Sequence, residues 1–191
     1  MTSSESNLPL ATETPFTDTF FFTQSIYPPK SYYEEGITTS LFSIERLDPN
    51  IKLVRSDYQK AVLQERADKD VYELLLVDGN EEITEGSRTN VFFVKGKELY
   101  TPPAKAVLLG IVRKKVFEIC GKRQIPINET AIPVEWVKDA EGAFVSGTGN
   151  NVLPISKIGA VAIPTMNNPI VQTIMADYAE MVSVYKEAKK H

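Results

Sequence analysis

The stretch Glu85-Gly86-Ser87-Arg88-Thr89-Asn90, followed by the apolar run Val91 to Val94, predicts a glycine turn that leads into a buried strand. Taken alone, this stretch is compatible with many folds. Three other segments give it a more specific meaning, because each offers a group that binds anions or forms covalent bonds. They are Ile51-Lys52, Leu109 to Arg113, and Ser146 to Asn151. Together the four segments supply an amine, a carboxylate and two anion-binding turns.

The composition narrows the class of protein. The chain has 191 residues, of which 42% are hydrophobic and 24% are charged, as in an ordinary globular protein. It has 21 basic and 25 acidic residues without a block of like charge, so nucleic acid and anionic membranes are not expected as partners. No apolar run reaches the roughly 20 residues of a membrane helix, and the N-terminus lacks the features of a secretory signal. We therefore expect a cytoplasmic protein.

Cysteine and histidine each occur once. Cys120 lies in a helix-like apolar pattern and is expected to be a buried small hydrophobe, and a single cysteine fits a reducing compartment. The histidine is the last residue, His191, which argues against catalysis by histidine and against a histidine-rich metal site. No metal ligand is predicted.

Predicted helices and strands are interspersed along the chain. Val71 to Val77 is nearly continuously apolar, as in a strand buried on both faces, and Val91 to Thr101 predicts a tight hairpin. Helices are predicted from Ser56 to Ala67, from Ile111 to about Arg123, and near the C-terminus. The last two have apolar faces, made by Val112, Val116, Ile119 and Cys120, and by Val171, Ile174, Tyr178, Met181 and Tyr185. This arrangement predicts a mixed α and β fold.

The four segments match the needs of pyridoxal phosphate (PLP). This cofactor needs a lysine amine for a Schiff base, an acidic group at its pyridine nitrogen, and N–H groups and hydroxyls around its phosphate. Lys52 offers the amine, and Glu85 offers the acid beside a turn. Gly110-Ile111-Val112 is placed at a helix N-terminus, where free amides and the helix dipole favour a phosphate. Thr148, in a glycine-flanked turn, adds a hydroxyl and amides.

Each of these groups has a more ordinary explanation when it is taken alone. A lysine before a helix is usually solvated, and a glutamate beside a turn is more often a turn or capping residue. Gly110-Ile111 starts an amphipathic helix in either case, and Ser146 to Asn150 does not have the pattern of a phosphate-binding loop. Arg113 and Asn90 are expected to be structural.

In order and spacing, the stretch from Lys52 to about Ile158 resembles the class IV aminotransferases, also called fold-type-IV PLP enzymes. This family includes branched-chain aminotransferase, D-amino acid aminotransferase and 4-amino-4-deoxychorismate lyase. Its pattern is a lysine, a buried strand, E-G-x-x-x-N before apolar residues, T-P, L-x-G-I-x-R, and S-G-T before V-x-P. The matching segments here are Lys52, Glu85 to Val94, Thr101-Pro102, Leu108 to Arg113, and Ser146 to Pro154.

The resemblance implies a role for each matching residue. Lys52 would be the Schiff-base lysine and would move a proton at the substrate α-carbon, as general base and acid. Glu85 would be the partner of the pyridinium nitrogen. The two turns would complete the cofactor site, with Ile111, Val112 and Thr148 around the phosphate; the turn residues are Gly110, Ile111, Val112, Gly147 and Thr148. Gly149 and Asn150 would meet the substrate carboxylate.

The match departs from the family before the lysine. Members normally carry a whole small α/β domain there, whereas 51 residues precede Lys52 in this sequence. We therefore expect residues 1–51 to be a shortened N-terminal domain with a flexible tail, and residues 52–191 to be a complete PLP-binding domain. The family's phosphate-binding arginine is missing with the rest of that domain, which should weaken cofactor binding. Arg88 is also bulky in a run usually made of small residues.

Three functions are compatible with these observations. The favoured one is a homodimeric PLP enzyme that transfers an amino group between an amino acid and a 2-oxo acid, or eliminates pyruvate from an aminodeoxychorismate-like substrate. The first alternative is a relic that keeps the fold but binds PLP poorly and serves as a binding or regulatory module, which the missing arginine favours. The second is a structural or interaction protein with fortuitous motifs, against which the intact pair Lys52 and Glu85 argues.

Overall fold

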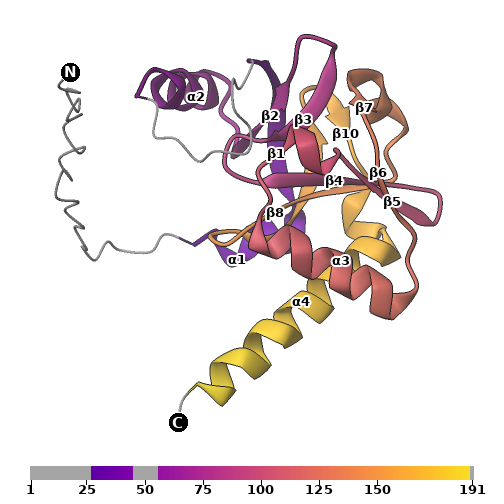
Figure 1. The fold of residues 1–191 in the computed structure, drawn as a ribbon. Coiled ribbons are helices and arrows are strands. Elements are labelled where there is room, and N and C mark those ends of the chain that lie inside the picture. Colours follow the sequence, from indigo (N-terminus) through magenta and orange to yellow (C-terminus); the bar gives the residue numbers. More distant parts are fainter. Residues whose placement is uncertain (1–26, 45–55, 190–191) are drawn as a thin grey trace, which may run out of the picture.

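The computed structural model describes residues 27–44 and 56–189. The α-helices of these residues are α1 (Lys30–Glu35), α2 (Ser56–Asp68), α3 (Ile111–Arg123) and α4 (Pro169–Ala188). The strands are β1 (Ile37–Ser43), β2 (Glu73–Val77), β3 (Glu82–Gly86), β4 (Asn90–Lys95), β5 (Glu98–Thr101), β6 (Ile127–Glu129), β7 (Ile132–Pro133), β8 (Gly142–Gly147), β9 (Asn151–Ile158) and β10 (Val161–Ala162). The predicted mixed α and β fold is confirmed (Figure 1).

The strands form one mixed sheet in the order β6-β5-β4-β8-β9-β1-β2-β3-β7, with β10 paired to β9. The predicted hairpin from Val91 to Thr101 is present, because β4 pairs with β5 in antiparallel orientation; β2 and β3 pair in the same way. Strand β1 lies between β9 and β2 and is parallel to both. Strand β1, from within residues 1–51, thus shares a sheet with the later strands. The domain boundary between residues 51 and 52 lies outside the described residues and stays a prediction.

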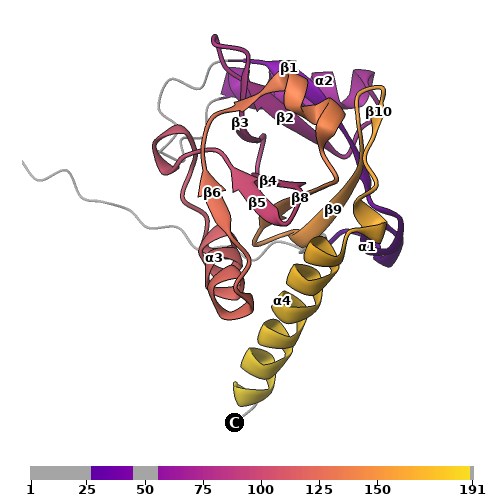
Figure 2. The same ribbon diagram turned by 90° about the vertical axis from the view of Figure 1, so that its right-hand side faces the viewer.

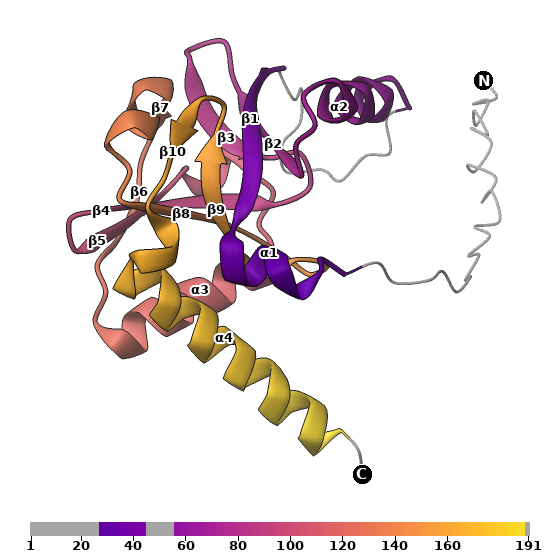
Figure 3. The ribbon, with the colours of Figure 1, turned by 180° about the vertical axis from the view of Figure 1, so that it is seen from behind.

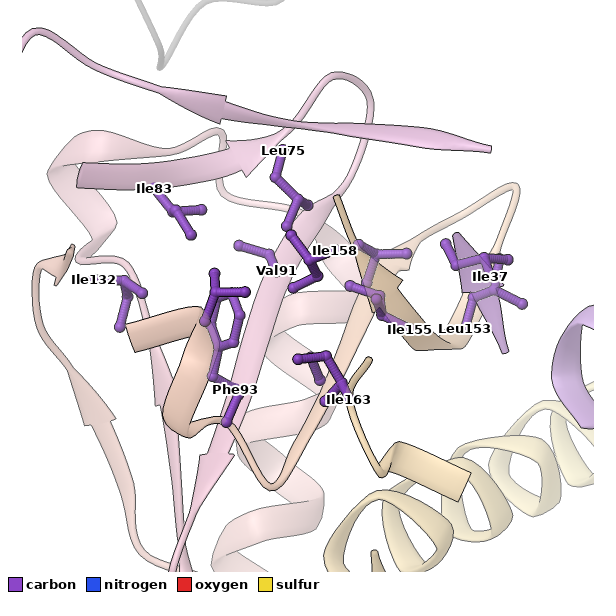
Figure 4. Packing of buried hydrophobic residues seen from close by; sticks show 14 of the residues in the cluster. Ile37, Leu75, Ile83, Val91, Phe93, Ile132, Leu153, Ile155, Ile158 and Ile163 are labelled. Atoms are coloured by element: carbon purple, nitrogen blue, oxygen red, sulfur yellow. The ribbon is translucent and has the colours of Figure 1, made fainter. Parts of the chain in front are cut away.

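The sheet curls so that its strands enclose one apolar core. Leu75 and Ile83, from β2 and β3, meet Val91 and Phe93 of β4 inside this core (Figure 4). Successive side chains of a strand point to opposite faces, so the intervening Phe92 packs in a second core. Strand β4 is therefore buried on both faces, which explains why its sequence is apolar without alternation.

The second core lies between the sheet and helices α3 and α4. The apolar face predicted for α3 is confirmed, because its four residues are all buried there: Val112, Val116, Ile119 and Cys120. Burial raises the pKa of the Cys120 thiol to about 11, so the thiol is neutral near pH 7. The expected burial of Cys120 is confirmed.

Helix α4 starts at a well-formed cap, since the Asn168 side chain accepts hydrogen bonds from the amides of Ile170 and Val171. The predicted apolar face is buried at Val171, Ile174 and Tyr178. Met181 is half-buried against the same core, whereas the prediction is wrong at Tyr185, which is 65% exposed. The reason is visible in Figures 2 and 3, where α4 extends past the sheet and its last turns lie away from the other described helices and strands.

Strand β9 is not evident from the sequence, because a proline interrupts its apolar run. Proline usually disfavours a position inside a sheet, yet Pro154 pairs with Phe144 of β8.

The apolar residues Phe20 to Phe22 and the following Thr23 predict a further short strand, which lies outside the described residues. In the two described ranges, no helix has the length and apolar character needed to cross a membrane.

Candidate functional site

A cavity of about 680 Å³ opens between α2, the β3–β4 turn, the start of α3 and the β8–β9 turn. Its volume is in the range of small-molecule and cofactor pockets, about 300–1,000 Å³. Six of the predicted cofactor-binding residues line it: Glu85, Gly110, Ile111, Val112, Gly147 and Thr148. The seventh, Lys52, lies outside the described residues. The tertiary structure thus brings together segments that are far apart in the sequence.

The β3–β4 turn is locked in place by the protein itself. The amide of Gly86 donates to the carbonyl of Thr89 over 2.7 Å, and a Cβ at Gly86 would overlap the Thr89 hydroxyl. Glu73 of β2 is fully buried beneath the turn. Its carboxylate accepts hydrogen bonds from the hydroxyls of Ser87 and Thr89. This network fixes the backbone on which Glu85 stands.

Glu85 and Asn90 together hold the segment that precedes α3. The amide of Leu108 donates to Glu85 Oε2 over 3.0 Å, and the carbonyl of Leu108 accepts from Asn90 Nδ2 over 2.8 Å. A Cβ at Gly110 would lie 2.5 Å from Asn90 Oδ1, so glycine is needed for this close approach. The Glu85 side chain is 3% exposed and reaches the cavity wall. A buried carboxylate is thereby oriented by the backbone next to a helix start.

The first turn of α3 offers backbone amides to the cavity. Gly110 is the N-cap and makes no side-chain capping hydrogen bond, so the first amides of the helix are available to an anion. Arg113 is turned away into structural contacts: its guanidinium donates to the Thr101 hydroxyl, the Pro102 carbonyl and the Glu129 carboxylate. Arg113 and Asn90 are structural, as expected.

The β8–β9 turn reaches the cavity with its first residues only. Gly147 and Thr148 line the cavity, whereas Gly149 and Asn150 do not. The carbonyl of Asn150 accepts from the Tyr33 hydroxyl over 3.0 Å, and its Oδ1 accepts from the Tyr72 hydroxyl over 2.7 Å. The predicted contact of Gly149 and Asn150 with the substrate carboxylate stays a prediction.

Helix α2 forms the remaining wall, and its contribution was not foreseen from the sequence. The helix contributes Tyr58, Gln59, Val62, Leu63 and Arg66 to the lining. Arg66 and Arg88 of the β3–β4 turn both lie near the ring of Tyr72: their guanidinium carbons are 6.0 Å and 4.9 Å from the ring centroid. In the sequence only Arg88 stood out, as a bulky residue in the turn, because no local pattern links it to Arg66.

The residues around the cavity fit PLP. The buried Glu85 carboxylate is suited to the pyridine nitrogen, and the uncapped start of α3 is suited to the phosphate. The Ser146 hydroxyl lines the cavity, is buried, and has no hydrogen-bond partner among the described residues, so it is available to a ligand. Three exposed apolar side chains complete the wall and would shield a flat ring: Leu63, Leu109 and Ile111.

Comparison with known proteins also links the chain to a family of aminotransferases. A family model described as amino-transferase class IV matches residues 3–158. The chain is 35% identical over 136 residues to a probable branched-chain-amino-acid aminotransferase of Rickettsia conorii, covering 68% of this chain and 47% of the relative. It is 27% identical over 145 residues to a D-alanine aminotransferase of Bacillus licheniformis, covering 74% of this chain and 50% of the relative.

A solved structure has the same fold. A putative branched-chain amino acid aminotransferase from Thermotoga maritima superposes with a TM-score of 0.74 at 25% identity, over 84% of this chain and 59% of that one. The chain spans about half the length of the curated relatives that it matches. The fold-type-IV architecture expected from the sequence is confirmed.

Proposed function

The chain belongs to the class IV aminotransferases, a family that uses PLP, and from this premise we propose that it transfers an amino group between an amino acid and a 2-oxo acid. The observation that carries the proposal is the cavity in which Glu85, the start of α3 and the Gly147-Thr148 turn meet. When bound, PLP supplies an electron sink that stabilises negative charge at the α-carbon of the amino acid. The residues of the chain have to bind the cofactor, orient it and move protons.

Glu85 orients the cofactor ring in this proposal. Its Oε2 is already engaged by the Leu108 amide, so the carboxylate cannot swing freely. The ring nitrogen would hydrogen-bond to the carboxylate, which keeps that nitrogen protonated. The amides at the start of α3 and the hydroxyls of Ser146 and Thr148 would receive the phosphate.

Lys52 would hold the cofactor covalently and carry the proton. Once the amino acid has displaced it, the Nζ of Lys52 would take the proton from the α-carbon as general base and return it as general acid. For this the Lys52 amine has to be neutral in part of the cycle, which burial beside a cationic cofactor favours.

The relatives favour transfer over elimination, since both curated relatives compared above carry the name aminotransferase. They differ in the amino acid, with branched-chain substrates named for one and D-alanine for the other. We propose a small apolar amino acid as donor, because the cavity wall includes the apolar side chains Leu63, Leu109 and Ile111.

We also propose that the protein works as a homodimer. The exposed fractions of these three side chains are 62% for Leu63, 64% for Leu109 and 70% for Ile111. A group of exposed apolar residues around a cavity is typical of an interaction surface. Light scattering of the purified protein across a dilution series tests this, and a monomer at every concentration would contradict it.

The cofactor test uses the purified protein. After addition of PLP, the sample is reduced with borohydride, and the pyridoxyl group is mapped by mass spectrometry, with Lys52→Ala as the control. We expect a single adduct on Lys52 in the wild-type protein and none at that site in the variant. Adducts scattered over surface lysines, unchanged in Lys52→Ala, would refute the proposal.

The activity test follows the amino donor. The PLP-loaded protein is incubated with leucine or with D-alanine and 2-oxoglutarate, and the 2-oxo acid product and glutamate are quantified. We expect stoichiometric formation of both products with one donor. Pyruvate release from aminodeoxychorismate, without amino transfer from any amino acid, would instead support the lyase.

A further inference from the structure

Two arginines line the cavity close to each other, and the described residues place one carboxylate, that of Glu73, beside them. Arg66 of α2 and Arg88 of the β3–β4 turn both line the cavity, and both guanidinium groups lie near the ring of Tyr72. Two like charges near one ring repel each other, and the repulsion is stronger where water is partly excluded. Burial and the charge of Arg88 together lower the pKa of Arg66.

The carboxylate of Glu73 faces this pair, and most of its hydrogen-bond acceptor sites are occupied by other donors. It accepts hydrogen bonds from the Leu74 amide and from the hydroxyls of Ser87 and Thr89. Its Oε2 lies 3.5 Å from Arg88 Nε, longer than a good charge-assisted hydrogen bond. One largely occupied carboxylate thus stands opposite two cations.

Among the described residues, the Nε–H donor of Arg66 has no acceptor. Its Nε is buried and has no hydrogen-bond partner among the described residues, and the same residues provide it with no ion pair. The contact with Tyr72 engages the face of the guanidinium but leaves this N–H without an acceptor. A buried donor without an acceptor is costly unless a ligand supplies one.

We propose that Arg66 and Arg88 form an oxyanion-binding subsite of the cavity, which takes a carboxylate or a phosphate group. Each guanidinium presents a planar set of donors that matches the two oxygens of such a group, and an anion placed between them removes the repulsion. The Arg88 side chain is 45% exposed, so the subsite is accessible from solvent. Both arginines line the same cavity as the start of α3.

Tyr72 links this subsite to the β8–β9 turn. Its ring lies against both guanidinium groups, and its hydroxyl donates to Asn150 Oδ1. An anion bound by the arginines would therefore be next to a residue that orders the turn carrying Thr148. The nature of the anion rests on the proposed function, because that function brings two oxyanions to the cavity: the cofactor phosphate and the carboxylates of the substrate.

The experiment measures anion binding without catalysis. The purified protein at low ionic strength is titrated with inorganic phosphate and, separately, with glutarate, and the dissociation constants are obtained by calorimetry. The variants are Arg66→Gln, Arg88→Gln and the conservative Arg66→Lys. The control is Lys60→Gln, which removes the same charge from an exposed position of α2 outside the cavity lining.

We expect Arg66→Gln and Arg88→Gln each to weaken binding of one probe by about tenfold or more, the loss of one charge-assisted contact. Arg66→Lys should recover part of the affinity, and Lys60→Gln should change it by less than about twofold, as a distant charge does. Weakened binding of phosphate alone identifies the cofactor phosphate as the occupant, and weakened binding of glutarate alone identifies a substrate carboxylate.

Equal affinity of all variants for both probes would overturn the inference, as would equal weakening by Lys60→Gln, which indicates a general effect of charge. The proposed function is checked separately by borohydride mapping in the wild-type protein. An adduct on Lys52 together with unchanged anion binding would refute the subsite alone. Arginine-dependent anion binding without an adduct would refute the proposed function alone.

Discussion

The two walls of the cavity differ in how completely their polar groups are paired. The inner wall, made by Glu85, Gly86, Asn90 and Gly110, is held by hydrogen bonds within the protein and by close glycine contacts. The outer wall includes Arg66 and Arg88, which bring two cations together near the ring of Tyr72, and it leaves Arg66 Nε without an acceptor among the described residues. The inner wall has its geometry before any ligand arrives, whereas the outer wall is completed by one.

The difference has a physical cause in the position of each wall. The inner wall rests on buried strands and on the Glu73 carboxylate, where unpaired polar groups are expensive and packing is tight. The outer wall is half-exposed at Arg88, but the Nε of Arg66 is buried and has no acceptor among the described residues until a ligand supplies one. Substitutions in the two walls should therefore separate loss of stability from loss of ligand binding.

The largest expected effect comes from the support of the inner wall. Glu73→Ala removes the acceptor of Ser87, Thr89 and the Leu74 amide, and we expect the free energy of unfolding to fall by about 3–5 kcal/mol. Urea denaturation measures it, with Glu180→Ala on the exposed face of α4 as the control. A loss below that of the control would mean that the Glu73 network does not hold the turn.

The next effect tests the close approach at the start of α3. Gly110→Ala places a Cβ 2.5 Å from Asn90 Oδ1, so Asn90 has to move, at a cost of about 1–3 kcal/mol of stability. Cofactor affinity should fall as well, because the helix start shifts. The control is Gly121→Ala in the same helix, where a Cβ meets no atom within 4 Å, and which should stabilise by about 0.5–1 kcal/mol. Equal effects of the two changes would contradict the tight inner wall.

A smaller effect is expected where the outer wall joins the β8–β9 turn. Tyr72→Phe keeps the ring against the arginines but removes the hydrogen bond to Asn150, so we expect a loss of about 1 kcal/mol. Thermal unfolding measures it, with Tyr185→Phe at an exposed position of α4 as the control. Unchanged stability in Tyr72→Phe would show that Asn150 does not depend on this bond.

The smallest effect on stability is expected in the outer wall itself. Arg66→Gln removes one of two repelling charges and no described ion pair, so we expect the free energy of unfolding to change by less than about 0.5 kcal/mol. The same urea measurement as for Glu73→Ala gives the value. A loss of several kcal/mol would make Arg66 a structural residue and would remove the contrast between the walls.

The sequence predicted the inner wall well because its residues lie in short contiguous motifs. Glu85 to Asn90 carries its own turn chemistry, and Leu108 to Arg113 carries a helix start, so local physics suffices for each segment. Their meeting at one cavity was inferred from the family pattern and is seen in the fold.

Two features could not be predicted from the sequence, because they depend on contacts between residues far apart in the chain. Strand β1 enters the middle of the sheet between β9 and β2, which no local pattern of Ile37–Ser43 specifies. Asn150 follows the cavity-lining residue Thr148 closely in sequence, but its polar groups are held by Tyr33 and Tyr72 from two other elements. The packing around a turn decides which of its residues face a cavity.

The sequence by itself determined the fold class, the family and the chemical types of the inner wall, because these depend on motifs whose residues are neighbours in the chain. Only the tertiary structure decided that Arg66 and Arg88 meet near the ring of Tyr72. That juxtaposition depends on how α2 docks over the β3–β4 turn. Docking of this kind is set by packing between elements, which local sequence patterns do not encode.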